Sequence, residues 1–134
     1  MIQYLLDTNA VSYMLRSASP HFSARFEASY VSQSGISVVT EAELLFGLAR
    51  RPQAHALARS VHAFLRRVVI VPWTSDAAGM YADIRADLES RGQPMEDLDM
   101  MIAAEALVQN AVLITSDKAF RRIGGLKIED WTAL

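Results

Sequence analysis

The sequence predicts an α/β fold, a three-layer α/β/α sandwich with a central, mostly parallel sheet of four to five strands. Two observations predict it. Short apolar runs alternate with stretches of helical periodicity, which is typical of a parallel sheet with helices on both faces. The first apolar run stops abruptly at Asp7-Thr8-Asn9 and a helical pattern follows at once, as at the strand-to-helix corners where α/β proteins place their chemistry.

Length and composition predict one globular domain over residues 1–134. Of these 134 residues, 51% are hydrophobic and 21% are charged, and no repeat or linker divides the chain. The chain has no Cys, which excludes a disulfide framework, a thiolate metal site and a Cys nucleophile. No apolar run approaches the ~20 residues of a membrane span, and Asp7 comes too early for a signal peptide. We therefore expect a cytoplasmic protein without membrane association.

The expected elements follow from the apolar runs and from the cap residues between them. Ser19-Pro20 is a typical helix start, with a capping hydroxyl and a first-turn proline. Ser75 and Asp97 are in position to open two later helices. Strands are expected at residues 2–6, 35–39, 68–71 and 111–114, with 126–128 as an edge strand, and helical patterns follow residues 9, 20, 43, 54, 75 and 97, with a short one through Phe120.

Four acids stand at equivalent corners of this pattern. Asp7, Glu43 and Asp117 each lie just beyond the carboxyl end of an expected strand. Asp99 lies in the first turn of an expected helix. Parallel strands would bring these corners to one edge of the sheet, where four carboxylates repel each other unless a hard cation binds. Oxygen ligands of this kind suit Mg²⁺ or Mn²⁺, which can activate water and neutralise a phosphodiester.

Helix capping is the alternative explanation of each acid. Asp7 and Asp117 are good N-cap residues, and Thr40-x-x-Glu43 matches a capping box. Asp99 suits the positive end of a helix dipole. A non-enzymatic interaction module, in which the acids only cap helices, therefore stays open at this point.

The net charge of −2 includes the four acids of the predicted cluster, and the rest of the chain is more basic. Without the four clustered acids, the other residues sum to +2, and eleven of the 13 basic residues are Arg, whose planar fork suits phosphate. Three of the basic residues, Lys118, Arg121 and Arg122, directly follow Asp117 and are candidate phosphate contacts. A solvated helix face explains them equally well.

Four motifs together resemble the PIN-domain ribonucleases. They are Leu5-Leu6-Asp7-Thr8-Asn9, Thr40-x-Ala42-Glu43-Leu44, Asp99-x-x-Ile102-Ala103-Ala104 and Thr115-Ser116-Asp117. The ending, from Arg121-Arg122-Ile123 through Gly125 to Glu129-Asp130-Trp131, resembles that of VapC toxins of VapBC toxin–antitoxin systems. The resemblance spans nearly the whole chain and implies a PIN-like fold.

The resemblance also implies an activity and partners. It implies an Mg²⁺- or Mn²⁺-dependent endoribonuclease that is a homodimeric toxin neutralised by a VapB antitoxin. The RNA substrate would be cut in an accessible single-stranded region, such as a tRNA or rRNA loop. By position, the resemblance assigns Asp7, Glu43, Asp99 and Asp117 as catalytic acids, with Asp7, Asp99 and Asp117 as metal ligands and Thr8, Asn9 and Thr115 as supporting polar residues.

Two residues depart from the family pattern. Glu96 stands where the family usually has Gly, one turn before Asp99, and Asp97 adds another acid beside it. We expect Glu96 to face solvent or an Arg and not to bind metal. Glu105 stands where many relatives have His.

Other enzymes remain as alternatives. A haloacid-dehalogenase-like phosphatase also has an Asp after its first strand, but its second Asp two residues later is replaced here by Asn9. A PIN-domain nuclease acting on DNA or in RNA processing is closer. Large apolar residues near the corners are candidates for an antitoxin or dimer groove: Tyr13, Met14, Leu45, Phe46 and Leu48.

Overall fold

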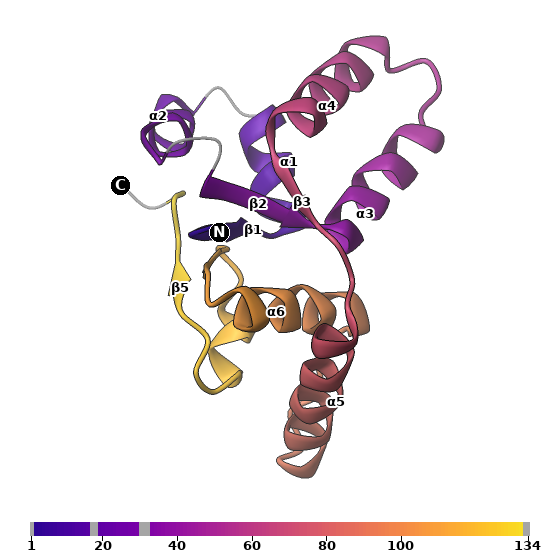
Figure 1. Ribbon diagram of the computed structural model, residues 1–134. Helices are drawn as coiled ribbons and strands as arrows, with labels where there is room; N and C mark the ends of the chain where they lie inside the picture. Colours follow the sequence, from indigo (N-terminus) through magenta and orange to yellow (C-terminus); the bar gives the residue numbers. More distant parts are fainter. Residues whose placement is uncertain (1, 17–18, 30–32, 133–134) are drawn as a thin grey trace.

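The computed structural model describes residues 2–16, 19–29 and 33–132 and shows a fully parallel five-stranded sheet (Figure 1). The strand order is β3-β2-β1-β4-β5, and every neighbouring pair is parallel. This confirms the predicted sheet. The strands are β1 (Tyr4–Leu6), β2 (Ser34–Ser37), β3 (Val69–Val71), β4 (Val112–Ile114) and β5 (Ile128–Glu129).

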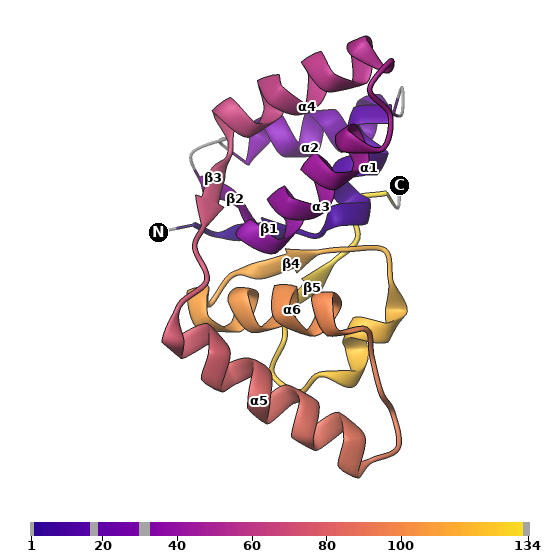
Figure 2. The ribbon, with the colours of Figure 1, turned by 90° about the vertical axis from the view of Figure 1, so that its right-hand side faces the viewer.

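Helices cover both faces of the sheet, as Figure 2 shows. One face carries α1 (Thr8–Arg16), α2 (Pro20–Ala28) and α4 (His55–Arg67). The other carries α5 (Ser75–Ser90) and α6 (Asp97–Gln109), which pack closely against each other. Two further elements follow strand ends, α3 (Val38–Ala49) after β2 and the 3₁₀ turn η2 (Lys118–Arg122) after β4. The described helices include none that is long and apolar enough to cross a membrane.

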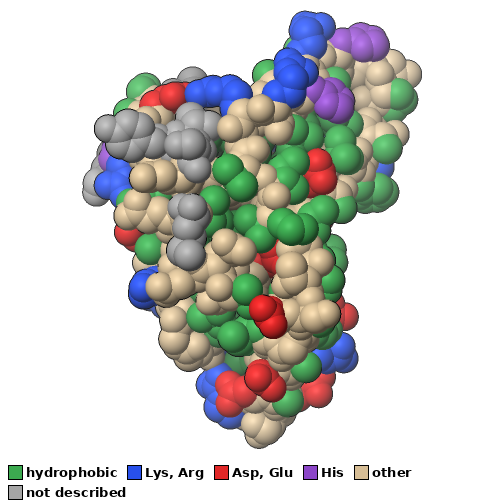
Figure 3. All heavy atoms as spheres, in the orientation of Figure 1, with side chains coloured by type: hydrophobic (Ala, Val, Ile, Leu, Met, Phe, Trp, Pro, Cys, Tyr) green, Lys and Arg blue, Asp and Glu red, His purple; other side chains and the backbone are tan. Residues whose placement is uncertain are grey.

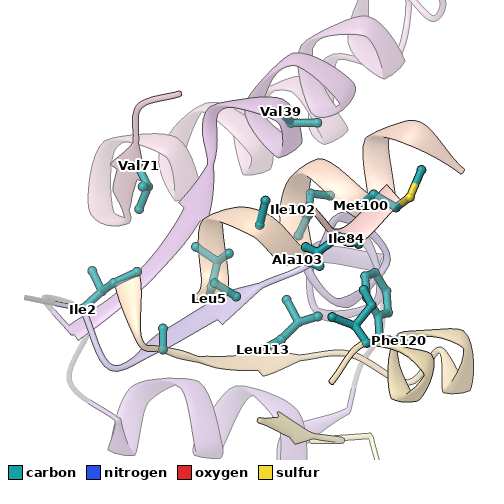
Figure 4. Close-up of a cluster of buried hydrophobic side chains, with 14 of the residues drawn as sticks. Ile2, Leu5, Val39, Val71, Ile84, Met100, Ile102, Ala103, Leu113 and Phe120 are labelled. Atoms are coloured by element: carbon teal, nitrogen blue, oxygen red, sulfur yellow. The ribbon is translucent and has the colours of Figure 1, made fainter. Parts of the chain in front are cut away.

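The central strand β1 supplies residues to two separate hydrophobic cores because its side chains alternate between the faces. Leu5 packs with Leu113 and Ile102 on the α5–α6 side, which Figure 4 shows in close-up. Leu6 packs with Ile114 and Phe22 on the opposite side. Both leucines are fully buried, and this explains why the first strand is a nearly continuous apolar run rather than an alternating one.

The order of strands places a topological switch point beside β1. From β1 the chain moves outward to β2 and β3, then returns through α5 and α6 to pair β4 with the other side of β1. Ligands of open α/β sheets bind in the crevice beyond the carboxyl ends of the strands at such a point. Asp7 and Thr115 are the first residues beyond β1 and β4 at this crevice.

The second expected strand ends earlier than the sequence pattern suggested. Val38 and Val39 were expected to be in the strand, but they form the first turn of α3, which is capped by the Ser37 hydroxyl accepting from Val39 N at 2.9 Å. Thr40 and Glu43 therefore lie inside the helix, and the predicted capping box is wrong. β-branched valines favour a strand locally, but a well-placed serine cap starts the helix.

Other helix starts differ only slightly from expectation. Ser19 caps α2 as predicted, with Pro20 in its first turn. The cap of α5 is Thr74 rather than Ser75, and α6 begins at Asp97 as predicted. The last strand pairs at Ile128–Glu129 instead of 126–128.

Two glycines give a test of the sheet packing. A Cβ added to Gly35 in β2 would lie 3.0 Å from Ile2 Cδ1 and 3.1 Å from the Val69 carbonyl oxygen, which the sheet holds in place. We predict that Gly35→Ala destabilises the protein by about 1–3 kcal/mol through overpacking. Gly79→Ala in α5 is the matched control, since a Cβ there meets nothing within 4 Å and should stabilise the helix by up to about 1 kcal/mol. Urea denaturation of both variants checks the opposite signs.

Candidate active site

Asp7 is a buried carboxylate at the end of the central strand. Its side chain is 3% exposed, and Oδ1 accepts from Ala10 N at 2.7 Å, so the residue does cap α1. Its backbone N donates to the Ile114 carbonyl oxygen at 3.1 Å, which fixes it beside the end of β4. Burial raises the pKa of Asp7, and hydrogen bonds from Thr115 and from Ala10 N partly oppose that rise.

The Thr8 hydroxyl links the start of α1 to α3. It donates to Glu43 Oε1 at 2.6 Å and is hydrogen-bonded to the Thr40 hydroxyl at 3.0 Å. Thr40 is fully buried, so this contact holds the start of α1 against α3. One oxygen of the half-buried Glu43 is thereby fixed in place.

Thr115 links Asp7, at the end of β1, to Asp117, which precedes η2. Its buried side chain hydrogen-bonds to Asp7, and its Oγ1 also accepts from Asp117 N at 3.0 Å. Asp117 is exposed and caps η2, with Oδ1 accepting from Ala119 N at 2.9 Å. The capping interpretation of Asp117 is therefore confirmed, without excluding a second role.

Asp99 completes the group from the first turn of α6. Its carboxyl is half-buried, and its pKa is raised to about 6, first by burial and then by the charges of Asp117, Asp7, Glu43 and Glu96. The other three predicted acids therefore lie near Asp99, with Glu96 as an additional neighbour. Glu96 is exposed, as predicted, and it is the N-cap residue of α6 without a side-chain capping bond.

Two surface hollows adjoin the acids. One, of about 420 Å³, is lined by Asp99, Asp117, Glu96 and Asp97 together with Arg122. The other, of about 320 Å³, lies between α1, α3 and α4 and reaches Thr8, Asn9 and Glu43. Over residues 2–16, 19–29 and 33–132, no three or more His, Asp or Glu side chains are arranged closely enough to hold a metal ion. The acids thus share an electrostatic site without closing around one point.

The other predicted residues divide between the site and the surface. Arg122 lines the acidic hollow, and its guanidinium donates to the Pro94 carbonyl oxygen at 3.3 Å. Lys118 and Arg121 are exposed and do not line either hollow. The sequence interpretation missed Thr40 as a site residue, because it assigned this threonine to a capping box; its position opposite Thr8 depends on the pairing of β1 with β2.

Glu105 is a second buried acid, outside the cluster. It is 1% exposed in the middle of α6, and neither carboxyl oxygen has a hydrogen-bond partner among the described residues. Burial raises its pKa to about 7. A carboxyl without a partner in such a place is most stable when it is protonated.

Comparison with known proteins agrees with this geometry. The family described as PIN domain matches residues 4–126 of the chain. The tRNA(fMet)-specific endonuclease VapC of Salmonella typhimurium is 31% identical over 98% of this chain and 99% of its own length. The chain belongs to the PIN-domain family and, within it, to the VapC ribonucleases, as the resemblance implied. The phosphatase alternative is therefore wrong.

Solved structures show the same fold over the full length. DNA-bound VapBC from Salmonella typhimurium has a TM-score of 0.92 and 31% identity, covering 98% of this chain and 99% of that one. VapBC2 from Rickettsia felis, bound to a DNA fragment from its promoter, has a TM-score of 0.89 and 29% identity with the same coverage.

The raised pKa of Asp99 makes a prediction about stability. Because its folded-state pKa of about 6 lies above the ordinary 3.8, the stability that protonated Asp99 contributes is fully present below pH 3.8 and is lost as the pH rises through about 6. In chelator, Asp99→Asn should therefore raise the melting temperature by a few degrees at pH 7.5 and have little effect at pH 4. Asp83→Asn, at an exposed site on α5, is the control and should leave the melting temperature unchanged at both values.

Glu105 makes a parallel prediction with a different pH window. The folded protein holds its proton up to a pKa of about 7, against 4.5 ordinarily, so stability falls as the pH rises between these values. Glu105→Gln removes this titration and should stabilise the protein by roughly 2 kcal/mol at pH 8, with no gain at pH 4.5. Urea denaturation at the two pH values measures the difference, and an equal effect at both would contradict the buried, uncompensated carboxyl.

Proposed function

We propose that the chain is an endoribonuclease toxin of a type II toxin–antitoxin system, which hydrolyses RNA phosphodiester bonds with Mg²⁺ or Mn²⁺ as cofactor. The observation that carries this proposal is the shared site of four carboxylates at the switch point of a PIN-domain sheet. Its full-length VapC relatives support the substrate class, since one of them is a tRNA(fMet)-specific endonuclease. A tRNA or rRNA loop is the proposed target.

The donor chemistry of the site fits a hard divalent cation. All four acids offer carboxylate oxygens. The Asp99 pKa is raised first by burial and then by the charges of its acidic neighbours, and positive charge at this place would be stabilising. Asp7 and Asp99 would hold a first ion, and Asp117 would hold a second or its water shell. A divalent cation bound there supplies charge neutralisation for the phosphodiester and acidifies a bound water.

The residues of the chain have distinct roles in the proposed reaction. Thr8 fixes one oxygen of Glu43, which leaves the other to orient the attacking water and to accept its proton. Thr115 holds Asp7 and the Asp117 backbone in register. Asn9 is exposed at the start of α1 and lines the hollow that reaches Glu43, where it can donate to the RNA.

The proposed partners are a VapB-type antitoxin and a second copy of the chain. The VapBC complexes from Salmonella typhimurium and Rickettsia felis resemble the chain over nearly its whole length, which supports the antitoxin. Of the apolar residues suggested for a groove, Leu45 and Phe46 are exposed, at 39% and 62%, while Tyr13, Met14 and Leu48 pack against the core. Leu45 and Phe46 are therefore the most accessible of the five, whereas Met14 and Leu48 are partly buried at the edges of surface hollows.

Charge-removing substitutions separate metal binding from capping. Asp7→Asn, Glu43→Gln, Asp99→Asn and Asp117→Asn preserve capping geometry but remove one negative charge each. We predict losses of RNA cleavage of roughly 100-fold or more, largest at Asp7 and Asp99 and smallest at Asp117, in excess Mg²⁺ or Mn²⁺. Thermal melts in chelator verify that each variant is folded.

Glu96→Gln is the matched control for these substitutions. It removes an equal charge from an exposed neighbour of Asp99, and cleavage should stay within a few-fold of the wild type. Four folded acid variants that cleave at wild-type rates would show that the carboxylates only cap helices. A loss at Glu96 as large as that at Asp99 would show that this chain uses a rebuilt metal site.

A further inference from the structure

The hollow between α1, α3 and α4 has opposite charges at its two ends. Thr8, Asn9 and Glu43 lie at the end beside the acidic site, since Thr8 and Asn9 begin α1 and Glu43 belongs to the first half of α3 and accepts a hydrogen bond from Thr8. Arg16, Arg50 and Arg51 line the other end, at and just beyond the last turns of the same helices. At 1.5 Å per residue, the distance along α1 from Thr8 to Arg16 is about 12 Å.

The three arginines of this hollow are not neutralised within the protein. Arg16, Arg50 and Arg51 are exposed, and none of them takes part in an ion pair among the described residues. Other arginines of the chain differ in this respect, since Arg25, Arg67, Arg85 and Arg91 each pair with a carboxylate. The hollow thus presents free guanidinium groups in a region that adjoins the acids.

An exposed aromatic ring adjoins this end of the hollow through Arg50, although the ring itself does not line the hollow. Phe46 is the most exposed of the large hydrophobic side chains, and the Arg50 guanidinium lies over its ring, 5.0 Å from the centroid. Stacking of this kind restrains the guanidinium. Basic side chains beside an exposed aromatic ring are the combination with which proteins hold single-stranded nucleic acid. From α4, Leu57 and Val61 line the hollow, so the basic and His side chains that Figure 3 shows over this helix lie outside it.

We infer that this hollow is the path along which single-stranded RNA enters the site, an inference that rests on the proposed ribonuclease function. Arg16, Arg50 and Arg51 contact phosphates on one side of the bond that is cut, and Phe46 stacks on a base. The length of about 12 Å accommodates roughly three to four stacked nucleotides at ~3.4 Å each. The enzyme therefore recognises a short single strand beside the cleavage point, which a rigid duplex would not supply.

The alternative occupant is a protein segment with acidic residues. The distribution of charge in the hollow favours RNA. Its inner end leads to the carboxylates of the acidic site, and these would repel an acidic peptide. A cation bound to the same carboxylates would instead attract a phosphodiester. This alternative is included below as an outcome.

The test is the affinity of a fluorescent single-stranded RNA 12-mer in EDTA, so that binding is measured without cleavage. Arg50→Gln/Arg51→Gln should weaken binding about tenfold or more and reduce the slope of log affinity against log salt by about 1.4, which is ~0.7 for each lost phosphate contact. Arg59→Gln/Arg66→Gln is the matched control. It removes the same charge from exposed, unpaired arginines on α4 outside the hollow, and should change affinity less than twofold.

A second pair of variants tests the stacking surface. Phe46→Ala should weaken binding roughly tenfold, whereas Phe46→Tyr keeps an aromatic face and should bind as the wild type does. Leu45→Ala, at the neighbouring exposed apolar residue, should have no effect on RNA affinity.

Several results would overturn the inference. Equal loss in the hollow and control pairs would show that binding depends on net charge alone. Unchanged RNA affinity in the hollow pair, with lost binding of the co-expressed antitoxin, would assign the hollow to the protein partner. The proposed function is tested separately, by RNA cleavage in the four acid variants. If these variants lose cleavage while Arg50→Gln/Arg51→Gln retains RNA affinity, the proposed RNA path is wrong and the proposed function stands. A wild-type protein that neither binds nor cleaves RNA would overturn both.

Discussion

The burial of a charged Asp7 side chain at the end of the central strand is the constraint on which the rest of the site depends. A carboxylate that is almost inaccessible to water is costly unless hydrogen bonds or a cation compensate it. Here the compensation comes from Ala10 N at the start of α1 and from Thr115 at the end of β4. The first is a local contact, but the second requires the parallel pairing of β1 with β4, so that the sheet and the site form together.

Two threonines extend this arrangement to the other acids. Thr8 connects the first corner to Glu43 on α3, and Thr115 connects it to Asp117. Neither hydroxyl carries charge, yet each holds a carboxylate or its backbone at a position where it repels its neighbours. The stability of the α/β fold thus holds carboxylates of like charge close together. A bound cation would reduce the repulsion between them.

The sequence was sufficient for the architecture and for the acids because both depend on local patterns. Apolar runs that end in Asp or Thr gave the strand ends, and the common direction of parallel strands placed Asp7, Glu43 and Asp117 at one edge. The capping box around Thr40 was wrong because the choice between strand and helix at Val38-Val39 is decided by the Ser37 hydroxyl, one residue earlier. The contact of Thr40 with Thr8 and the isolation of Glu105 could not be predicted, since both depend on how distant elements pack. At Asp7 and Asp117, capping of a helix start occurs together with membership of the acidic cluster, although the sequence analysis treated the two as alternatives.

The pairing of β1 with β4 has a consequence for the synthesis of the protein. β1 emerges from the ribosome long before its neighbour β4, because Tyr4 pairs with Val112 and Asp7 meets Thr115, more than 100 residues later in the sequence. Until that last segment has emerged, β1 lacks one of its two neighbours and the four acids cannot be brought together. Non-local pairing of this kind forms late. A nascent chain from which β4 has not yet emerged therefore cannot assemble the acidic site.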